Sequence, residues 1–159
     1  MFAYLKELRP NVSTANDDSS YTYMATGNAA AAFMYMPFAS MTNDERIAAG
    51  LSPLKVAYPE EGMGFGIDGF VVAKGSKNYD NAMTLLNWLM QPEVAAHNSE
   101  WQMYGCVNAA AAEYLSDAYR NNQFINVPDE LIRESEMIVT LSPELEAKYN
   151  EIYTDFINN

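Results

Sequence analysis

The segment over residues 58–78 constrains the fold of this chain most, because its glycines separate two short apolar runs. These runs, residues 54–58 and 70–73, are bounded by Gly and Pro, a pattern typical of strand, loop and strand. Asp68 lies between glycines at the entrance of the second expected strand, where a side chain can face a cleft. A single carboxylate there, with aromatic residues nearby in the sequence, favours a cationic ligand.

Residues 64–69 also match the pattern G-x-G-x-x-G, which forms a pyrophosphate-binding turn in dinucleotide-binding proteins. That turn must follow a strand and open a helix. Here the glycines lead into the expected strand at 70–73, and the carboxylate of Asp68 would repel an anion. The sequence therefore argues against a dinucleotide site.

The composition is that of a folded, acidic protein. Of the 159 residues, 49% are hydrophobic, which predicts one packed globule and argues against disorder. Nine Lys and Arg stand against 21 Asp and Glu, so the formal net charge of -12 repels nucleic acid and attracts cations. An acidic surface also serves solubility alone, so the charge does not by itself identify a ligand.

Catalysis has little support in the sequence. Cys106 is the only cysteine, which excludes an intramolecular disulfide and a CxxC motif. His97 is the only histidine, and we expect it to be a partly exposed helical residue rather than the base of a nucleophile. An acid/base pair of Asp68 with Glu60 or Glu61 would need two carboxylates in one pocket, which their spacing does not demand. We therefore predict that the chain is not an enzyme and uses no cofactor or metal.

Apolar spacing, caps and turn residues predict helices that alternate with short strands. The clearest helix covers residues 78–90, and Pro92 opens the next one. Each contains a tryptophan, Trp88 and Trp101, which we expect in the core. Such alternation implies an α/β layer fold. Further helices are predicted over residues 2–9, 41–49, 109–115, 128–139 and 142–156, a turn or short helix at 21–24, and a strand at 29–36 that Pro37 ends.

Five segments occur in an order and with a spacing that match a known family. Together they resemble the carboxy-terminal half of spermidine/putrescine-binding proteins, the extracytoplasmic substrate-binding subunits of polyamine ABC transporters. The resemblance covers essentially the whole chain. It rests on Leu5-Lys-Glu-Leu-Arg-Pro-Asn-Val12, Ala32-Phe-Met-Tyr35, Pro59-Glu-Glu-Gly62 with Asp68, Leu85-Leu-Asn-Trp-Leu89 with Gln91-Pro-Glu-Val-Ala95, and Tyr104 with Asn108.

The resemblance implies part of a two-lobed, periplasmic-binding-protein-like (type II) α/β fold, with helices packed on a mixed sheet. In this family the chain crosses between the lobes, and the cleft closes over a linear polyamine. Residues 1–67 would then end the second lobe, residues 68–112 would return to the first, and residues 113–159 would pack as helices on the second. The opening strands of the first lobe have no counterpart in this sequence, so we expect it to be a fragment.

The resemblance also implies where a ligand would lie. Tyr35 and Tyr104 correspond to aromatic ligand contacts, and Asp68 corresponds to a carboxylate that binds an amine. A polyamine is a row of ammonium groups joined by methylenes, so it suits carboxylates as acceptors and aromatic walls. The residue types at these three positions agree with that chemistry.

This chain departs from the family pattern at two places. Two residues before the carboxylate, the best-known members carry a tryptophan, whereas this chain has Gly66 with Phe65 beside it. A polar contact before the last helix has no clear counterpart, and Glu134 and Glu136 are the candidates. The ligand site expected from the sequence therefore comprises Tyr35, Phe65, Asp68, Tyr104, Glu134 and Glu136.

The implied partners are a polyamine and the membrane permease of an ABC transporter, and not nucleic acid. The whole protein is expected in the periplasm or anchored to the extracellular face of the membrane. No apolar run in the chain approaches the length of a membrane span, and its first ten residues lack the features of a signal peptide. Two other readings stay open: a binding protein for another cationic or small polar solute, and a fragment that forms a homodimer through an exposed apolar surface.

Overall fold

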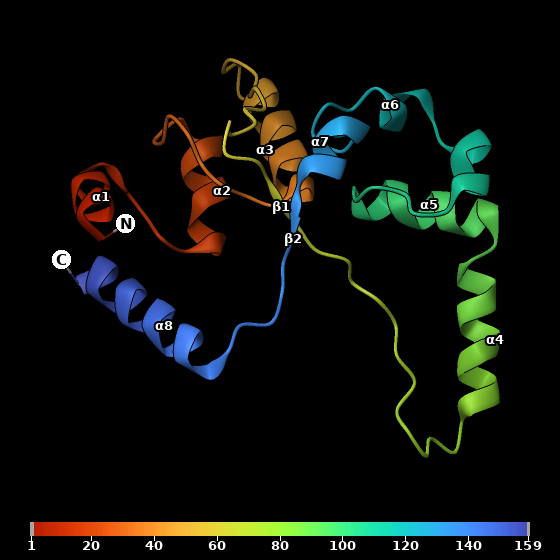
Figure 1. Cartoon of the computed structure of the whole chain (residues 1–159). Coiled ribbons are helices and arrows are strands. Elements are labelled where there is room, and N and C mark those ends of the chain that lie inside the picture. The colour runs from red at the N-terminus through yellow and green to blue at the C-terminus, as the bar shows by residue number, and fades with distance from the viewer. Residues whose placement is uncertain (1, 159) are drawn as a thin grey trace. The chain divides into compact units, whose positions relative to one another are not determined.

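The computed structural model describes residues 2–158, except for the side chains of Phe2, Asp17 and Asp18. The chain folds as two compact units, whose elements are labelled in Figure 1. Unit 1 consists of the chain up to Met34, Thr42–Pro53 and the chain from Ile138 onward, and unit 2 consists of Tyr35–Met41 and Leu54–Met137. All six residues of the expected ligand site therefore fall in unit 2.

Unit 1 is built from helices, and no strand occurs among its described residues. The helices predicted at its two ends are confirmed, and the one expected near Tyr21 is longer than predicted. In chain order they are α1 (Phe2–Leu8), the 3₁₀ helix η1 (Arg9–Asn11), α2 (Asp17–Ala25), the later part of α3 (Met36–Ala48) and α8 (Pro143–Asn158).

Side-chain and glycine caps define the ends of α2. The side chain of Asn16 accepts a hydrogen bond from the backbone amide of Ser19 at 3.2 Å, which satisfies one of the free amides of the first turn. Gly27 follows the last turn with a φ of 77°, a left-handed conformation that glycine adopts at low cost. These two residues explain why the helix covers only this stretch.

Arg9 holds the carboxyl end of α8. Its Nε donates to the carbonyl of Phe156 at 2.8 Å, and another guanidinium nitrogen donates to the carbonyl of Ile157 at 3.4 Å. The guanidinium carbon also lies 5.6 Å from the centroid of the Phe156 ring. A cation at this position satisfies free carbonyls and opposes the negative end of the helix dipole, so it fixes the start of the chain to α8.

Unit 2 combines helices with a small parallel sheet, which agrees with the predicted α/β class. Strand β1 (Gly64–Phe65) pairs with β2 (Glu136–Met137), and the register sets Gly64 opposite Glu136 and Phe65 opposite Met137. The sheet is smaller than the sequence predicts. The other elements are the first part of α3, α4 (Tyr79–Leu89), α5 (Pro92–Gln102), the 3₁₀ helix η2 (Ala109–Tyr114), α6 (Asp117–Arg120) and α7 (Asp129–Glu134).

The core of unit 2 forms where α5 packs against η2 and the segment that follows it. Ala96 on α5 and Ala111 on η2 are both fully buried, and their small side chains let the two helices approach closely. Half-buried Ala95, Met103 and Cys106 pack around this cluster. Its buried members are Ala96, Ala111, Leu115, Tyr119 and Ile125.

Three segments predicted as strands form no strand: residues 29–36, 54–58 and 70–73. In the described part of the chain none of them lies beside a partner strand. Strand hydrogen bonds are made between neighbours, so an unpaired segment keeps its backbone groups in water. Figure 1 shows the consequence as a long extended stretch between β1 and α4, in which Val71 is 91% exposed.

The boundaries of two predicted helices also differ from the structure. Pro37 was expected to end a strand, but it lies in the first turn of α3, where its missing amide costs no hydrogen bond. The helix expected over 128–139 ends at Glu134, after which the chain turns into β2.

Both tryptophans are exposed rather than buried, at 52% for Trp88 and 81% for Trp101. The buried face of α5 is centred on Ala96, which packs against η2. Trp101 follows five residues later, about 140° around the helix, so it points away from that face. The expectation that these two residues belong to the core is wrong.

Candidate functional site

The six residues expected to contact ligand lie on separate elements of unit 2. No hydrogen bond joins the side chains of any two of them among the described residues. They form a set of mostly exposed side chains and not a closed pocket. Tyr35 precedes α3, Phe65 is in β1, Asp68 is in the extended stretch after β1, Tyr104 follows α5, Glu134 ends α7 and Glu136 begins β2.

The sheet brings Phe65 and Glu136 next to each other along the backbone. The amide of Glu136 donates to the carbonyl of Met63 at 2.9 Å, which starts the pairing of β1 with β2. Side chains alternate between the two faces of a strand, so Phe65 shares a face with its partner Met137, and Glu136 shares the opposite face with Gly64. Phe65 and Glu136 therefore present their side chains to different sides of this small sheet.

The backbone of Tyr104 is anchored at a sharp turn after α5. α5 ends at Gln102. The next residue, Met103, has a φ of 57°, a left-handed conformation that is uncommon for a residue with a side chain and turns the chain sharply. The hydroxyl of the buried Tyr119 then donates a hydrogen bond to the carbonyl of Tyr104. The side chain of Tyr104 remains 42% exposed, so a rigid backbone presents an aromatic ring to solvent.

Asp68 is exposed and lies in the stretch over 66–73, which has no regular structure. Its carboxylate accepts no hydrogen bond from any of the described residues. Its apolar neighbours Ile67 and Phe70 are exposed as well. The carboxylate is therefore open to an ammonium group, with apolar side chains on the same stretch of chain.

The glycines at 64–69 do not form a dinucleotide-binding turn. They begin in β1 and continue into the extended stretch, and the next helix starts only at Tyr79. A pyrophosphate needs amides at the start of a helix directly after the glycines. These residues therefore lack the strand–turn–helix context of a dinucleotide-binding motif.

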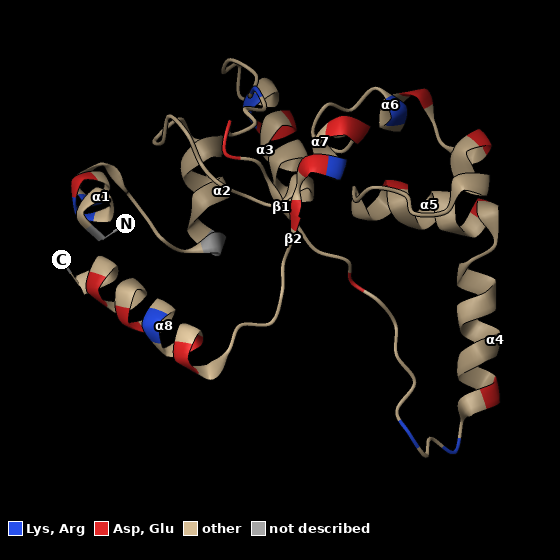
Figure 2. Cartoon of the chain, in the orientation of Figure 1, with Lys and Arg blue, Asp and Glu red and all other residues tan. Residues whose placement is uncertain are grey.

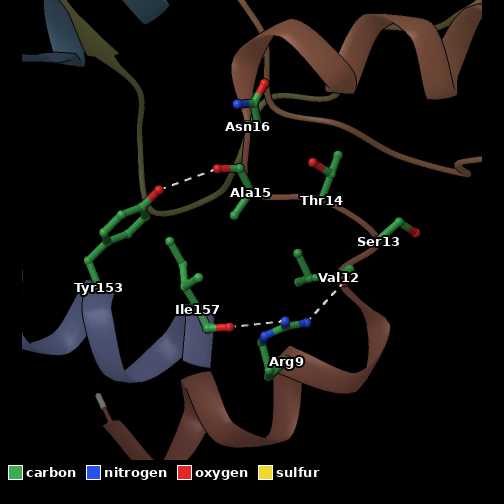
Figure 3. A pocket seen from close by; sticks show the side chains of 8 residues that line it. All are labelled: Arg9, Val12, Ser13, Thr14, Ala15, Asn16, Tyr153 and Ile157. Atoms are coloured by element: carbon green, nitrogen blue, oxygen red, sulfur yellow. Dashed lines mark hydrogen bonds between the residues drawn. The ribbon is translucent and has the colours of Figure 1, made fainter. Parts of the chain in front are cut away.

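A hollow of about 300 Å³ lies in unit 1 between the start of the chain and α8 (Figure 3). The guanidinium of Arg9 points at carbonyls of its own unit, and the Tyr153 hydroxyl donates to the carbonyl of Ala15 at 3.4 Å. Among the described residues that line it, none carries a carboxylate, so it does not suit a cation. Its lining is Arg9, Val12, Ser13, Thr14, Ala15, Asn16, Tyr153 and Ile157.

A second hollow, of about 470 Å³, lies in unit 2 and contains two aromatic and two acidic side chains. None of the six expected ligand residues lines it. His97, which was expected to be a helical and partly exposed residue, is exposed on α5 and lies in this hollow. The lining residues are Trp88, Glu93, Val94, His97, Asn98, Glu100 and Tyr114.

The carboxylate of Glu100 is hydrogen-bonded to the segment that follows η2. Its Oε1 accepts a hydrogen bond from the backbone amide of Ser116 at 2.5 Å. This bond, with a smaller contribution from the Ser116 hydroxyl, lowers the pKa of the Glu100 carboxyl below its usual value. Glu100 is therefore held in place at the edge of the hollow. Sequence reasoning missed this site, although Glu93, His97 and Glu100 share one face of a helix by their spacing.

Acidic side chains outnumber basic ones and are spread along the chain. Figure 2 shows Asp and Glu on most helices, with Lys and Arg fewer and scattered. Over residues 2–158, no three His, Cys, Asp or Glu side chains are grouped so that they could hold a metal ion. Nor is any described helix long and apolar enough to cross a membrane.

Comparison with known proteins places the chain among bacterial binding proteins. The spermidine/putrescine-binding periplasmic protein of Escherichia coli K12 is 30% identical over 132 residues, which is 83% of this chain and 36% of that protein. The putrescine-binding periplasmic protein SpuD of Pseudomonas aeruginosa is 27% identical over 150 residues, 93% of this chain and 40% of that protein. PotF, a putrescine-binding periplasmic protein of Escherichia coli K12, is 29% identical over 125 residues, 78% of this chain and 34% of that protein.

The chain thus spans between 34% and 40% of the length of these relatives. A family described as bacterial extracellular solute-binding protein matches residues 1–125, which is most of the chain. The match includes four of the six expected ligand residues and both tryptophans of unit 2. The chain belongs to the bacterial extracellular solute-binding protein family.

Proposed function

We propose that this chain is part of the solute-binding component of an ABC importer and that the whole protein binds a polyamine such as putrescine or spermidine. The observation that carries the proposal is the similarity over 83% of the chain to a spermidine/putrescine-binding protein. Two further relatives are named for putrescine binding. The protein would work on the extracytoplasmic side of the membrane, as a binding partner of a permease and not as an enzyme.

The chemistry of three exposed side chains supports this ligand. Asp68 offers an open carboxylate for an ammonium group, and a hydrogen bond to a charged group contributes about 1.5–3 kcal/mol. Tyr35 and Tyr104 offer exposed rings to the methylenes and to a second ammonium, at about 0.5–2 kcal/mol for each cation–π contact. The net charge of -12 attracts a polycation and repels nucleic acid.

Phe65, Glu134 and Glu136 remain secondary members of the proposed site. Phe65 would supply an apolar wall for the methylenes of the ligand. Because Phe65 and Glu136 face opposite sides of the β1–β2 pair, we expect at most one of them to contact the same end of a ligand. Glu134, at the end of α7, is then the alternative acceptor.

In the whole protein we assign residues 1–67 to the end of the second lobe, residues 68–112 to a return into the first lobe, and residues 113–159 to helices on the second lobe. A solute-binding cleft encloses most of its ligand. The chain spans well under half of its relatives, so enclosure needs residues from the rest of the protein. We therefore expect weak or no polyamine binding by these 159 residues alone.

Calorimetric titration of spermidine and putrescine into the complete protein tests this proposal. Asp68→Asn should weaken binding by about tenfold or more, because a charge-assisted hydrogen bond is lost. Asp44→Asn, an exposed change on α3 in unit 1, removes the same charge and should leave affinity unchanged. Equal affinities for both variants would remove Asp68 from the site, and absence of polyamine binding by the unchanged protein would refute the proposed ligand.

A second role is favoured by the exposed apolar side chains of the isolated chain. Phe70 and Val71 in unit 2 and Ile138 and Val139 in unit 1 are each more than two-thirds exposed. Exposed apolar side chains within each unit are available to pack against a second copy of the chain. If the chain acts as a self-associating module, light scattering will give the mass of a dimer at high protein concentration and that of a monomer on dilution.

A further inference from the structure

We propose that the hollow between α4, α5 and η2 of unit 2 binds a small organic monocation, such as an alkylammonium ion. It is lined by none of the residues of the proposed polyamine site. The inference rests on the residues of this hollow and does not depend on the polyamine proposal.

The walls and the charged edge of the hollow come from three packed elements. Trp88 projects from α4 and Tyr114 from η2, and each is about half exposed, at 52% and 51%. α5 lies between them and contributes Glu93, His97 and Glu100, spaced four and three residues apart on one helix face. The arrangement sets two carboxylates beside two aromatic rings.

Hydrogen bonds hold these elements in place without a ligand. The Asn108 side chain before η2 donates to the Met90 carbonyl at the end of α4 at 2.8 Å. The Ser116 amide after η2 donates to Glu100 on α5. Buried Ala96 and Ala111 complete the contact between α5 and η2. A hollow that is already formed binds a ligand with little ordering cost.

The lining selects a cation. Two carboxylates repel an anion, whereas an ammonium can donate to them while its alkyl chain covers the indole and phenol rings. A metal ion is not favoured, because the described residues contain no group of three or more His, Cys, Asp or Glu arranged to hold one. The volume of about 470 Å³ is within the range of small-molecule sites.

Trp88 is accessible to a ligand in this structure. Its helix was expected to bury this residue, yet more than half of the side chain is exposed. Tryptophan is the best partner for a cation–π contact. The half-exposed indole leaves ring surface open to such a contact.

The experiment is a titration of n-butylammonium chloride into the purified chain, followed by the indole N–H signals in ¹H–¹⁵N NMR spectra. The chain has two tryptophans, so the Trp101→Phe variant assigns the Trp88 signal. We expect the Trp88 signal to shift with saturation in about the millimolar range. The Trp101 signal, from an exposed residue outside the hollow, should stay in place.

Variants and probes then identify the interaction. Glu93→Gln should weaken n-butylammonium binding about three- to fivefold, as expected for an exposed ion pair. Glu113→Gln is the control, because it removes the same charge on η2 outside the hollow and should have no effect. Asp68→Asn should also have no effect. n-Butanol has a similar shape without the charge and should not reproduce the shift.

Three outcomes would overturn the proposal. One is a Trp88 signal that does not move, or that moves in proportion to the Trp101 signal without saturation. Another is an equal response to n-butanol, which would make the hollow an apolar site. The third is an equal response to calcium chloride, which would make it a general site for positive charge.

Discussion

Replacing Tyr119 by Phe tests whether the core of unit 2 fixes the backbone beside Tyr104. Tyr119 is 7% exposed, and its hydroxyl donates to the carbonyl of Tyr104. A neutral hydrogen bond contributes about 0.5–1.5 kcal/mol, and a carbonyl left without any donor costs about 1–3 kcal/mol. Because Tyr104 is 42% exposed, water can replace the lost donor. We therefore expect the free energy of unfolding to fall by about 1 kcal/mol.

Urea unfolding, followed by far-ultraviolet circular dichroism, measures this change. Tyr79→Phe is the matched control, since Tyr79 is an exposed tyrosine at the start of α4 and should lose almost nothing. Burial raises the pKa of Tyr119, so the unfolded chain releases this proton at lower pH than the folded chain. Stability of the unchanged protein should therefore fall more steeply above about pH 10 than that of Tyr119→Phe. Equal urea midpoints for all three proteins would refute the reasoning.

Two more substitutions test contacts that fix other parts of the chain. Arg9→Met keeps much of the side-chain length but removes the donors to the Phe156 and Ile157 carbonyls, so urea unfolding should show a loss of about 0.5–1.5 kcal/mol. Glu100→Gln removes a carboxylate whose pKa the Ser116 amide lowers. That carboxylate stabilises the fold above its unfolded pKa of about 4.5, and its contribution is lost as the pH falls. The difference in urea midpoint between the unchanged protein and Glu100→Gln should therefore shrink from neutral pH to about pH 3.

Each of these substitutions has a matched control in the same unit. Lys148→Met removes an exposed cation in the middle of α8 and should change stability by less than about 0.5 kcal/mol. Glu113→Gln removes an exposed carboxylate on η2 and should give a midpoint difference that does not change in this way with pH. A loss for Lys148→Met as large as that for Arg9→Met would mean that Arg9 acts through its charge alone. A midpoint difference for Glu100→Gln that does not change with pH would exclude the proposed role of the Ser116 bond.

The starts of several helices could be predicted from the sequence, because the residues at and beside a helix start determine it. Pro92 and Pro143 stand at the first position of α5 and α8, and α4 starts directly after Asn78 as expected. The family match confirms the predicted class, part of a two-lobed type II α/β fold. The strand predicted at 70–73 does not form, because a strand also requires a neighbouring strand, which no local pattern can reveal.

The candidate sites could also be predicted only in part: the sequence indicates the residue types, but not how their side chains are oriented. Asp68, Tyr35 and Tyr104 have side chains of the kinds that bind cations, and their role as ligand contacts remains a prediction. The opposite orientation of Phe65 and Glu136 depends on the register of two strands far apart in the sequence. The prediction that Trp88 lies in the core is wrong, because helical spacing shows which residues share a face but not which face packs on a neighbour.

The parallel pairing of β1 with β2 also has a consequence for the order of folding. Nearly all of unit 2, from α4 to α7, lies between these two strands along the chain. Closing so long a loop costs more chain entropy than joining adjacent elements, and contacts between distant residues slow folding. α5 and η2 are neighbours in the sequence and share the buried core, so we expect them to pack first. Phe65 and Glu136 then reach their final positions last, when the two strands meet.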